Sequence, residues 1–210
     1  LKGGSGFYEG TTANKIVNLM KARGGLIDHR DLNDFTAPWV EPVRGVFRGH
    51  TIISMPPPSS GGITLLQILK LIEPFDLEGL GLNSANSIHL LTESMNLAYR
   101  DRNQYLGDPD QIDIPVRRLL SRSHIDSLRD QLNLQSHTSA ADLSGQAPLS
   151  SGFNTTHLSV ADRDGSLVAL TTTLNFAYGN GIAVPGSGFL LNNELADFTA
   201  KPGVPNAYGL

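Results

Sequence analysis

The hydrophobic pattern changes from helical to alternating across residues 137–154, and no other feature of the sequence constrains the fold as much. Before this segment, apolar residues recur at spacings of three and four, which is typical of amphipathic helices. The segment itself is rich in Ser, Thr, Ala and Gly, which predicts a mobile linker. After it, residues 155–161 alternate, residues 163–165 give a turn signal, and residues 166–175 return as a second strand. The sequence therefore predicts an α+β fold in which a helical part leads into a β-hairpin.

Three main helices and an earlier strand pair are predicted before the linker. The first helix is capped by Thr11 or Thr12 and ends at Gly24, because a hydroxyl side chain favours a helix start and glycine a helix end. Strands over residues 43–47 and 51–54 form a pair. The helix faces expected to be buried are Ala13, Ile16, Val17 and Met20 in the first helix, Leu65, Ile68, Leu69 and Ile72 in the second, and Ile88, Leu91, Met95 and Tyr99 in the third.

Composition excludes several classes of function. The chain carries 16 Lys and Arg against 20 Asp and Glu, a formal net charge of −4, which argues against a nucleic-acid-binding surface. No cysteine is present among the 210 residues, which excludes disulfides, thiolate zinc sites, iron–sulfur clusters and a cysteine nucleophile. The histidines lack paired metal-ligand spacing and the glycine-rich stretches lack a dinucleotide fingerprint, so we expect no metal and no cofactor.

A hydroxyl residue at the start of the predicted hairpin is a candidate nucleophile. Thr155 follows the linker and Asn154 directly. If the peptide bond before Thr155 were cut, its new α-amino group, with a pKa near 8, could accept the proton of its own hydroxyl. Two other interpretations remain open: threonine is common in strands for steric reasons, and Asn154-Thr155-Thr156 also fits a glycosylation sequon.

Polar residues near the end of the chain form a second candidate group. Glu194 and Asp197 are three residues apart, a spacing that on a helical turn directs both carboxylates toward one ligand such as an ammonium group. Solvated surface carboxylates would show the same spacing. Strand alternation places Thr171, Thr173 and Asn175 on one face, which suits a polar pocket wall or a solvated strand face.

Several motifs, in order and spacing over essentially the whole chain, closely resemble the γ-glutamyltransferases. They are Met55-Pro-Pro-Pro-Ser-Ser-Gly-Gly62, Tyr105-Leu-Gly-Asp-Pro-Asp110, Thr155-Thr-His-Leu-Ser-Val-Ala-Asp162, Leu190-Leu-Asn-Asn-Glu194 and Lys201-Pro-Gly-Val-Pro-Asn206. The resemblance implies an N-terminal-nucleophile hydrolase, a layered αββα sandwich of which this chain holds only a part. It also implies a precursor that cuts itself between Asn154 and Thr155. Residues 1–154 would then be the C-terminal part of a large-subunit region ending in the linker, and residues 155–210 the N-terminal part of a small-subunit region.

The same resemblance assigns roles to the candidate residues. Thr155 would attack the γ-amide of glutathione or a related compound, and the γ-glutamyl ester would pass to water or to an acceptor amino acid or peptide. Thr173 would contact and activate this nucleophile. Asn175, Glu194 and Asp197 would hold the α-amino group and neighbouring atoms of the glutamyl moiety, and no cofactor is implied.

Some of the family's motifs do not occur in this chain. The arginine that binds the substrate carboxylate lies upstream of the matched region, and the Ser-Ser pair and Gly-Gly oxyanion hole lie downstream. We therefore expect a central segment of a longer precursor that needs the remaining subunit segments. Alone it should be a weak catalyst, since one lost oxyanion donor costs on the order of 10²- to 10³-fold.

Three other functions stay open: a related acylase, a poly-γ-glutamate depolymerase or transpeptidase, and a non-catalytic binding module. The chain starts at Leu1 with no targeting segment, so it looks like a cut point. The family resemblance alone suggests a periplasmic or secreted location.

Overall fold

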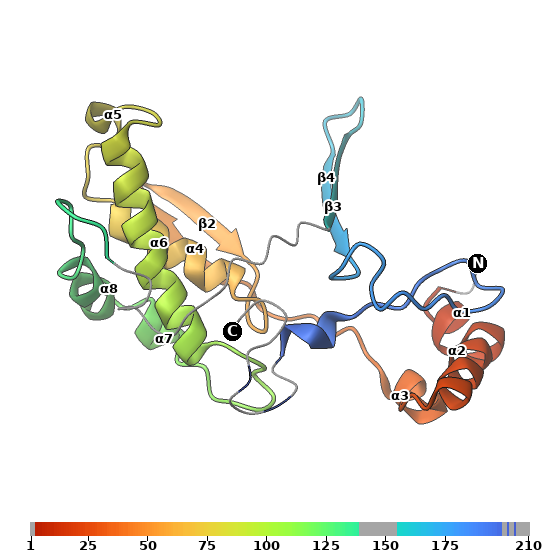
Figure 1. The fold of residues 1–210 in the computed structure, drawn as a ribbon. Coiled ribbons are helices and arrows are strands. Elements are labelled where there is room, and N and C mark those ends of the chain that lie inside the picture. The colour runs from red at the N-terminus through yellow and green to blue at the C-terminus, as the bar shows by residue number, and fades with distance from the viewer. Residues whose placement is uncertain (1–2, 139–154, 199–200, 202–203, 205–210) are drawn as a thin grey trace. The chain divides into compact units, whose positions relative to one another are not determined.

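The computed structural model describes residues 3–138 and 155–198, together with Lys201 and Val204 (Figure 1). Contacts divide the chain into two compact units, one of residues 39–147 and one that joins residues 1–38 to residues 148–210. The boundaries between these packed units differ from the predicted boundary between subunits at Asn154 and Thr155. The units are defined by contacts, whereas the subunits would be defined by a cut in the chain. Asn154 and most of the predicted linker lie outside the described residues, so the cut remains a prediction.

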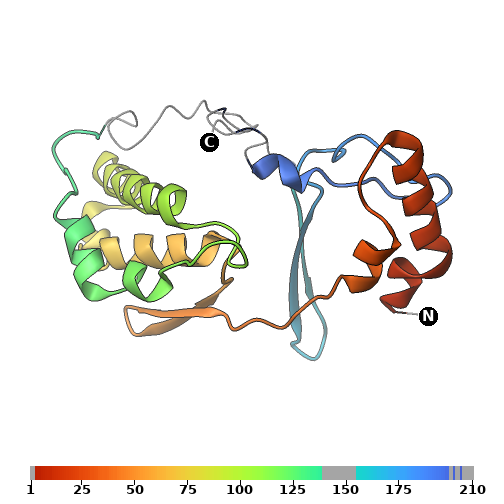
Figure 2. The same ribbon diagram turned by 90° about the horizontal axis from the view of Figure 1, so that it is seen from below.

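The unit of residues 39–147 is built around one helix, α4 (Gly61–Ile72). The hairpin of β1 (Val43–Phe47) and β2 (His50–Ser54) packs on one side of α4 and the long helix α6 (Ala85–Tyr105) on another, as Figure 2 shows. The unit also contains α5 (Leu77–Leu80), α7 (Val116–Leu119) and α8 (Arg122–Arg129). The predicted strand pair and both longer helices are thus confirmed.

Two glycines allow α4 to approach the hairpin closely. A Cβ atom on Gly45 of β1 would lie 2.5 Å from Leu66 Cδ2, and one on Gly62 of α4 would lie 2.1 Å from the carbonyl oxygen of Met55. A Cβ atom is essentially never found this close to a non-bonded atom. A larger side chain at Gly62 would therefore push the helix away from the backbone at Met55, and one at Gly45 would displace the Leu66 side chain. This explains why glycine occupies the last position of the motif, Gly62.

The buried face predicted for α4 is wrong in part, and the one predicted for α6 is wrong. Leu65 is 42% exposed, and all four residues predicted for the buried face of α6 are exposed, namely Ile88, Leu91, Met95 and Tyr99. In α4 the buried surface extends to Ile63 and Leu66, because the hairpin and α6 cover different sides of the helix. In α6 the buried face includes polar side chains, which a search for apolar periodicity does not find; these are Glu93, Ser94 and Asp101.

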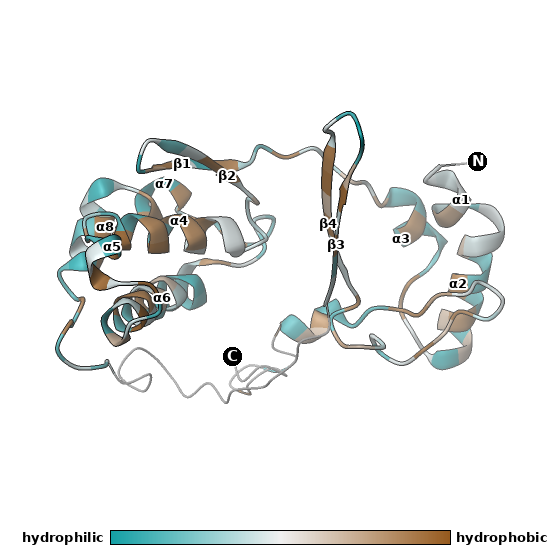
Figure 3. Cartoon of the chain, turned by 90° about the horizontal axis from the view of Figure 1, so that it is seen from above, coloured by the Kyte–Doolittle hydropathy of each residue, from teal (hydrophilic) through white to brown (hydrophobic). Residues whose placement is uncertain are grey.

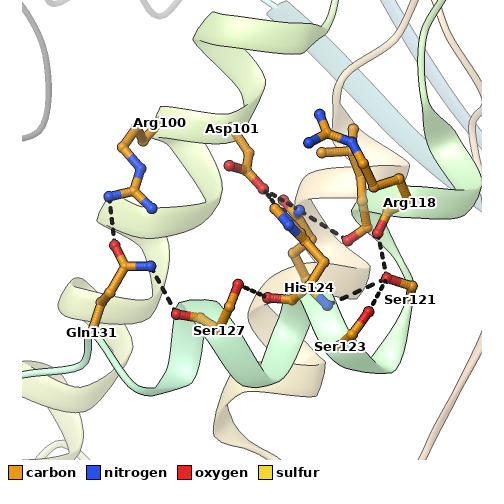
Figure 4. Close-up of polar contacts among 10 residues, drawn as sticks. Arg100, Asp101, Arg118, Ser121, Ser123, His124, Ser127 and Gln131 are labelled. Carbon is orange, nitrogen blue, oxygen red and sulfur yellow. Dashed lines mark hydrogen bonds and ion pairs between the residues drawn. The ribbon is translucent and has the colours of Figure 1, made fainter.

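A buried polar network connects four helices of this unit, α4, α6, α7 and α8. The Asp101 carboxylate accepts a hydrogen bond from Gln67 Nε2 at 2.7 Å and contacts His124 Nε2 at 2.5 Å. Gln67 Nε2 also donates to the carbonyl oxygen of Leu119 at 3.2 Å. Figure 4 shows Asp101 and His124 pointing toward each other from α6 and α8. The network satisfies a buried carboxylate, as a low-dielectric interior requires.

The other unit begins with three helices, α1 (Ser5–Tyr8), α2 (Gly10–Arg23) and α3 (His29–Asp34). Helix α2 ends as predicted, with Gly24 in the left-handed conformation at φ 71°. Its start differs from the prediction, because the N-cap position is Glu9 and no side chain caps it. The predicted residues Ala13, Ile16 and Val17 are buried, in a cluster that also contains Leu32 and Val184, whereas Met20 is only partly buried against it.

This unit also contains the predicted second hairpin, β3 (Thr155–Ala161) and β4 (Leu167–Thr173), and the short 3-10 helix η1 (Glu194–Asp197). Both strands carry hydrophobic residues, as Figure 3 shows, and every residue of the two strands is exposed. In the described part of the chain, no helix has the length and apolar character needed to cross a membrane.

Candidate functional site

The candidate site begins where β3 starts. Thr155 is the first residue of β3 and pairs with Thr173, the last residue of β4. Directly opposite residues of an antiparallel pair project from the same face of the sheet. Both threonine side chains therefore lie on one face at one end of the hairpin, although the sequence pattern alone did not predict that they pair.

The chain turns sharply after β4, and this turn corrects one prediction. Asn175 does not continue the strand face of Thr173, because β4 ends at Thr173 and Asn175 adopts the left-handed conformation at φ 72°. Asparagine tolerates this conformation better than most residues. The backbone N–H of Asn175 donates to Thr173 Oγ1 at 2.9 Å. Asn175 thus stays beside the threonine pair by a turn and not by strand alternation.

Asn175 connects the hairpin to η1. Its side-chain Nδ2 donates to Asp197 Oδ1 at 3.0 Å and to the carbonyl oxygen of Asn193 at 3.0 Å. A residue at the end of β4 is thereby joined to a carboxylate at the end of η1. The structure brings Thr155, Thr173, Asn175 and Asp197 into one connected group.

Glu194 and Asp197 lie on one helical turn, as their spacing predicted. The pKa of the Glu194 carboxyl is raised mainly by burial, and the negative charge of Asp197 raises it further. A carboxylate whose charge is destabilised by burial and by a neighbouring carboxylate favours a cationic ligand. An ammonium group is the cation that this pair suits, since charge-assisted hydrogen bonds are short and strong.

Two asparagines that contact this group, and a histidine on the strand face of Thr155, were not among the predicted site residues. Asn193 Oδ1 accepts from the backbone N–H of Phe176 at 3.0 Å, and Asn192 Oδ1 accepts from that of Glu194 at 3.0 Å. His157 shares a strand face with Thr155, and its Nδ1 contacts Thr171 Oγ1 at 2.7 Å. Alternation could have indicated His157, whereas the two asparagine contacts depend on tertiary structure.

Within the residues that the structure describes, no group of three or more His, Asp or Glu side chains could hold a metal ion. The functional groups of the candidate site are hydroxyl, amide and carboxylate groups. Such a set can provide a nucleophile and bind an ammonium group.

The sequence profile named Gamma-glutamyltranspeptidase matches residues 1–210. The chain belongs to the γ-glutamyltranspeptidase family. The "Glutathione hydrolase proenzyme" of Escherichia coli (strain K12) is 44% identical over 206 residues, which cover 97% of this chain and 35% of that protein. This family member thus spans about a third of the length of the curated relative.

Solved structures agree with the family assignment. The γ-glutamyltranspeptidase of Helicobacter pylori is similar to this family member with a TM-score of 0.65 and 39% identity, over 68% of this chain and 41% of that one. A cephalosporin acylase from Bacillus halodurans gives a TM-score of 0.76 with 26% identity, over 95% of this chain and 35% of that one. The expected fold class is confirmed: this family member has part of the α+β fold of the N-terminal-nucleophile hydrolases.

Proposed function

We propose that this chain supplies the nucleophile and the ammonium-binding groups of a self-processing enzyme that hydrolyses or transfers γ-glutamyl groups. The pairing of Thr155 with Thr173, next to the contact between Asn175 and Asp197, carries the proposal. These contacts bring a hydroxyl nucleophile and a carboxylate together within the unit of residues 1–38 and 148–210. Glutathione, named in relatives such as that of Escherichia coli, is the proposed donor.

In the proposed self-cleavage, Thr155 Oγ1 attacks the carbonyl carbon of Asn154. The peptide C–N bond breaks as the ester C–O bond forms, and water then hydrolyses the ester. Asn154 keeps the new carboxylate, and Thr155 gains a free α-amino group beside its hydroxyl. This amino group can accept the hydroxyl proton during turnover, so that no separate base is needed.

In the proposed turnover, Thr155 Oγ1 attacks the γ-carbonyl carbon of the donor, and the amine leaves with a proton. The γ-glutamyl ester then passes to water or to the amino group of an acceptor amino acid or peptide, which restores the hydroxyl. Thr173 would orient the nucleophile from the opposite strand. Asn175, Glu194 and Asp197 would hold the α-amino group, and these steps use no cofactor.

The proposal assigns other parts of the reaction to segments outside this chain. Groups that bind the donor's α-carboxylate and stabilise the oxyanion would come from the remaining large- and small-subunit segments. A periplasmic or secreted location is also part of the proposal and rests on the family resemblance.

The test uses protein expressed from its complete coding sequence. We expect intact mass to show a split between Asn154 and Thr155 during incubation at neutral pH, and γ-glutamyl-p-nitroanilide to release nitroaniline. Thr155→Ala should remain uncut and inactive, whereas Thr155→Ser should retain both reactions at lower rates. A Thr155→Ala protein that still releases glutamate from glutathione would contradict the proposal, and an uncut, inactive parent would favour a non-catalytic binding module.

The second candidate is an acylase, favoured by the similarity to the cephalosporin acylase. An acyl group need not carry an α-amino group, so an acylase has no need for two carboxylates at an ammonium site. Comparing γ-glutamyl-p-nitroanilide with glutaryl-p-nitroanilide, which lacks only the α-amino group, separates the two functions. Release of glutamate from poly-γ-glutamate would instead indicate a depolymerase.

A further inference from the structure

We infer that Asn192 and Asn193 are positioning residues that hold the ammonium-binding groups in place, which makes them determinants of selectivity for donors with an α-amino group. The inference rests on the proposed function. Neither residue needs to touch the reacting atoms. Each acts through a neighbour that the proposal places against the substrate.

Asn193 fixes the turn that carries Asn175. Its backbone N–H donates to the carbonyl oxygen of Leu174 at 3.1 Å, its carbonyl oxygen accepts from Asn175 Nδ2 at 3.0 Å, and its Oδ1 accepts from Phe176 N–H at 3.0 Å. Three consecutive residues are thus bound by one asparagine. Because Asn175 lies at φ 72°, a conformation of higher energy than the ordinary ones, the turn needs such contacts to remain in place.

The same residue also fixes the start of η1. The carbonyl oxygen of Asn193 accepts from the backbone N–H of Ala196 at 2.9 Å, within the turn that carries both carboxylates. Asn192 Oδ1 accepts from the backbone N–H of Glu194 at 3.0 Å. The asparagine pair therefore joins the two halves of the ammonium site, with Asn175 on one side and Glu194 and Asp197 on the other.

This arrangement predicts a selective defect. Removing Asn193 Oδ1 takes away the acceptor that Phe176 N–H has at 3.0 Å and should loosen the turn that carries Asn175, while the pairing of Thr155 with Thr173 does not involve Asn193. Self-cleavage involves no substrate ammonium group and should not depend on Asn193. Turnover of an amino-bearing donor should depend on it, because small displacements of binding groups cost up to about 10²-fold.

The experiment measures both reactions in protein expressed from its complete coding sequence. We expect Asn193→Ala to cleave itself at the parental rate, within about twofold, and to lose on the order of 10- to 100-fold in kcat/KM on γ-glutamyl-p-nitroanilide, mainly through KM. Asn193→Asp keeps an acceptor oxygen for Phe176 N–H and should recover most of the loss. Asn192→Ala should show a smaller loss of the same kind.

Asn180→Ala is the matched control. Asn180 Oδ1 accepts from the backbone N–H of Ile182 at 2.9 Å in the same unit, so the variant loses an equivalent local bond that involves neither Asn175 nor η1. It should match the parent in both reactions. Equal losses of self-cleavage and turnover in Asn193→Ala, or a loss in neither, would overturn the inference. A parent that neither cleaves itself nor turns over the donor would instead contradict the proposed function.

Discussion

Replacing Gln67 by leucine should destabilise the protein substantially, because this side chain satisfies two buried acceptors. Its Nε2 donates to Asp101 Oδ2 at 2.7 Å and to the carbonyl oxygen of Leu119 at 3.2 Å. Gln67 is 1% exposed and Asp101 is 3% exposed, so water cannot replace the lost donor. A hydrogen bond to a charged group contributes about 1.5–3 kcal/mol and one between neutral groups about 0.5–1.5 kcal/mol. We therefore expect Gln67→Leu to lower the free energy of unfolding by roughly 2–4 kcal/mol.

Urea unfolding followed by far-UV circular dichroism measures this change. Gln104→Leu is the matched control, because Gln104 lies on the exposed side of α6 and the same substitution there should change stability by less than about 0.5 kcal/mol. The double variant Gln67→Leu with Asp101→Leu removes donor and acceptor together. It should be more stable than the sum of the single changes predicts. Strict additivity, or a Gln67→Leu protein within about 0.5 kcal/mol of the parent, would refute the reasoning.

Two further predictions concern close packing and charge. Gly62→Ala should lower the free energy of unfolding by about 1–3 kcal/mol, seen as a lower thermal midpoint, because the new Cβ would lie 2.1 Å from the carbonyl oxygen of Met55. Asp197→Asn should move the acid limb of kcat/KM for γ-glutamyl-p-nitroanilide to lower pH. Donor binding needs ionised Glu194, whose raised pKa moves that limb toward higher pH, and removing the charge of Asp197 lowers that pKa. The maximum value of kcat/KM should also fall. An acid limb at the same pH in Asp197→Asn and the parent would show that Glu194 does not determine this limb.

The sequence predicted local structure well where a short-range rule decides it. The first helix ends at Gly24 because a left-handed residue is needed there, and the second hairpin follows from alternation interrupted by a turn at residues 163–165. The predicted buried face failed in part for α4 and entirely for α6, because burial depends on which partners surround a helix. Leu65 satisfies the periodicity and is nevertheless 42% exposed, whereas Asp101 is buried by a partner that no periodicity identifies.

The candidate site shows the same limit. Spacing indicated that Glu194 and Asp197 share a helical turn, and they do. No pattern indicated that Asn175 would leave the strand and reach Asp197, because that contact depends on a left-handed backbone conformation and on residues near position 193. Periodicity does not predict polar contacts between separate segments, so the contacts of Asn192 and Asn193 emerge only from the structure, although both residues stand in a motif.

The position of Thr155 in the hairpin explains how a nucleophile could be released from the middle of a chain without loss of structure. Thr155 is the first residue of β3, so a cut before it removes no residue from the strand, and each ladder pair from Thr155–Thr173 to Ala161–Leu167 lies on the retained side. A nucleophile placed further into the strand would lose pairs when the chain is cut. The groups proposed to bind the ammonium, Asn175 and Asp197, are joined to the β4 end of the same hairpin and also lie after the cut. Self-cleavage would thus free the amino group while the site that uses it stays assembled.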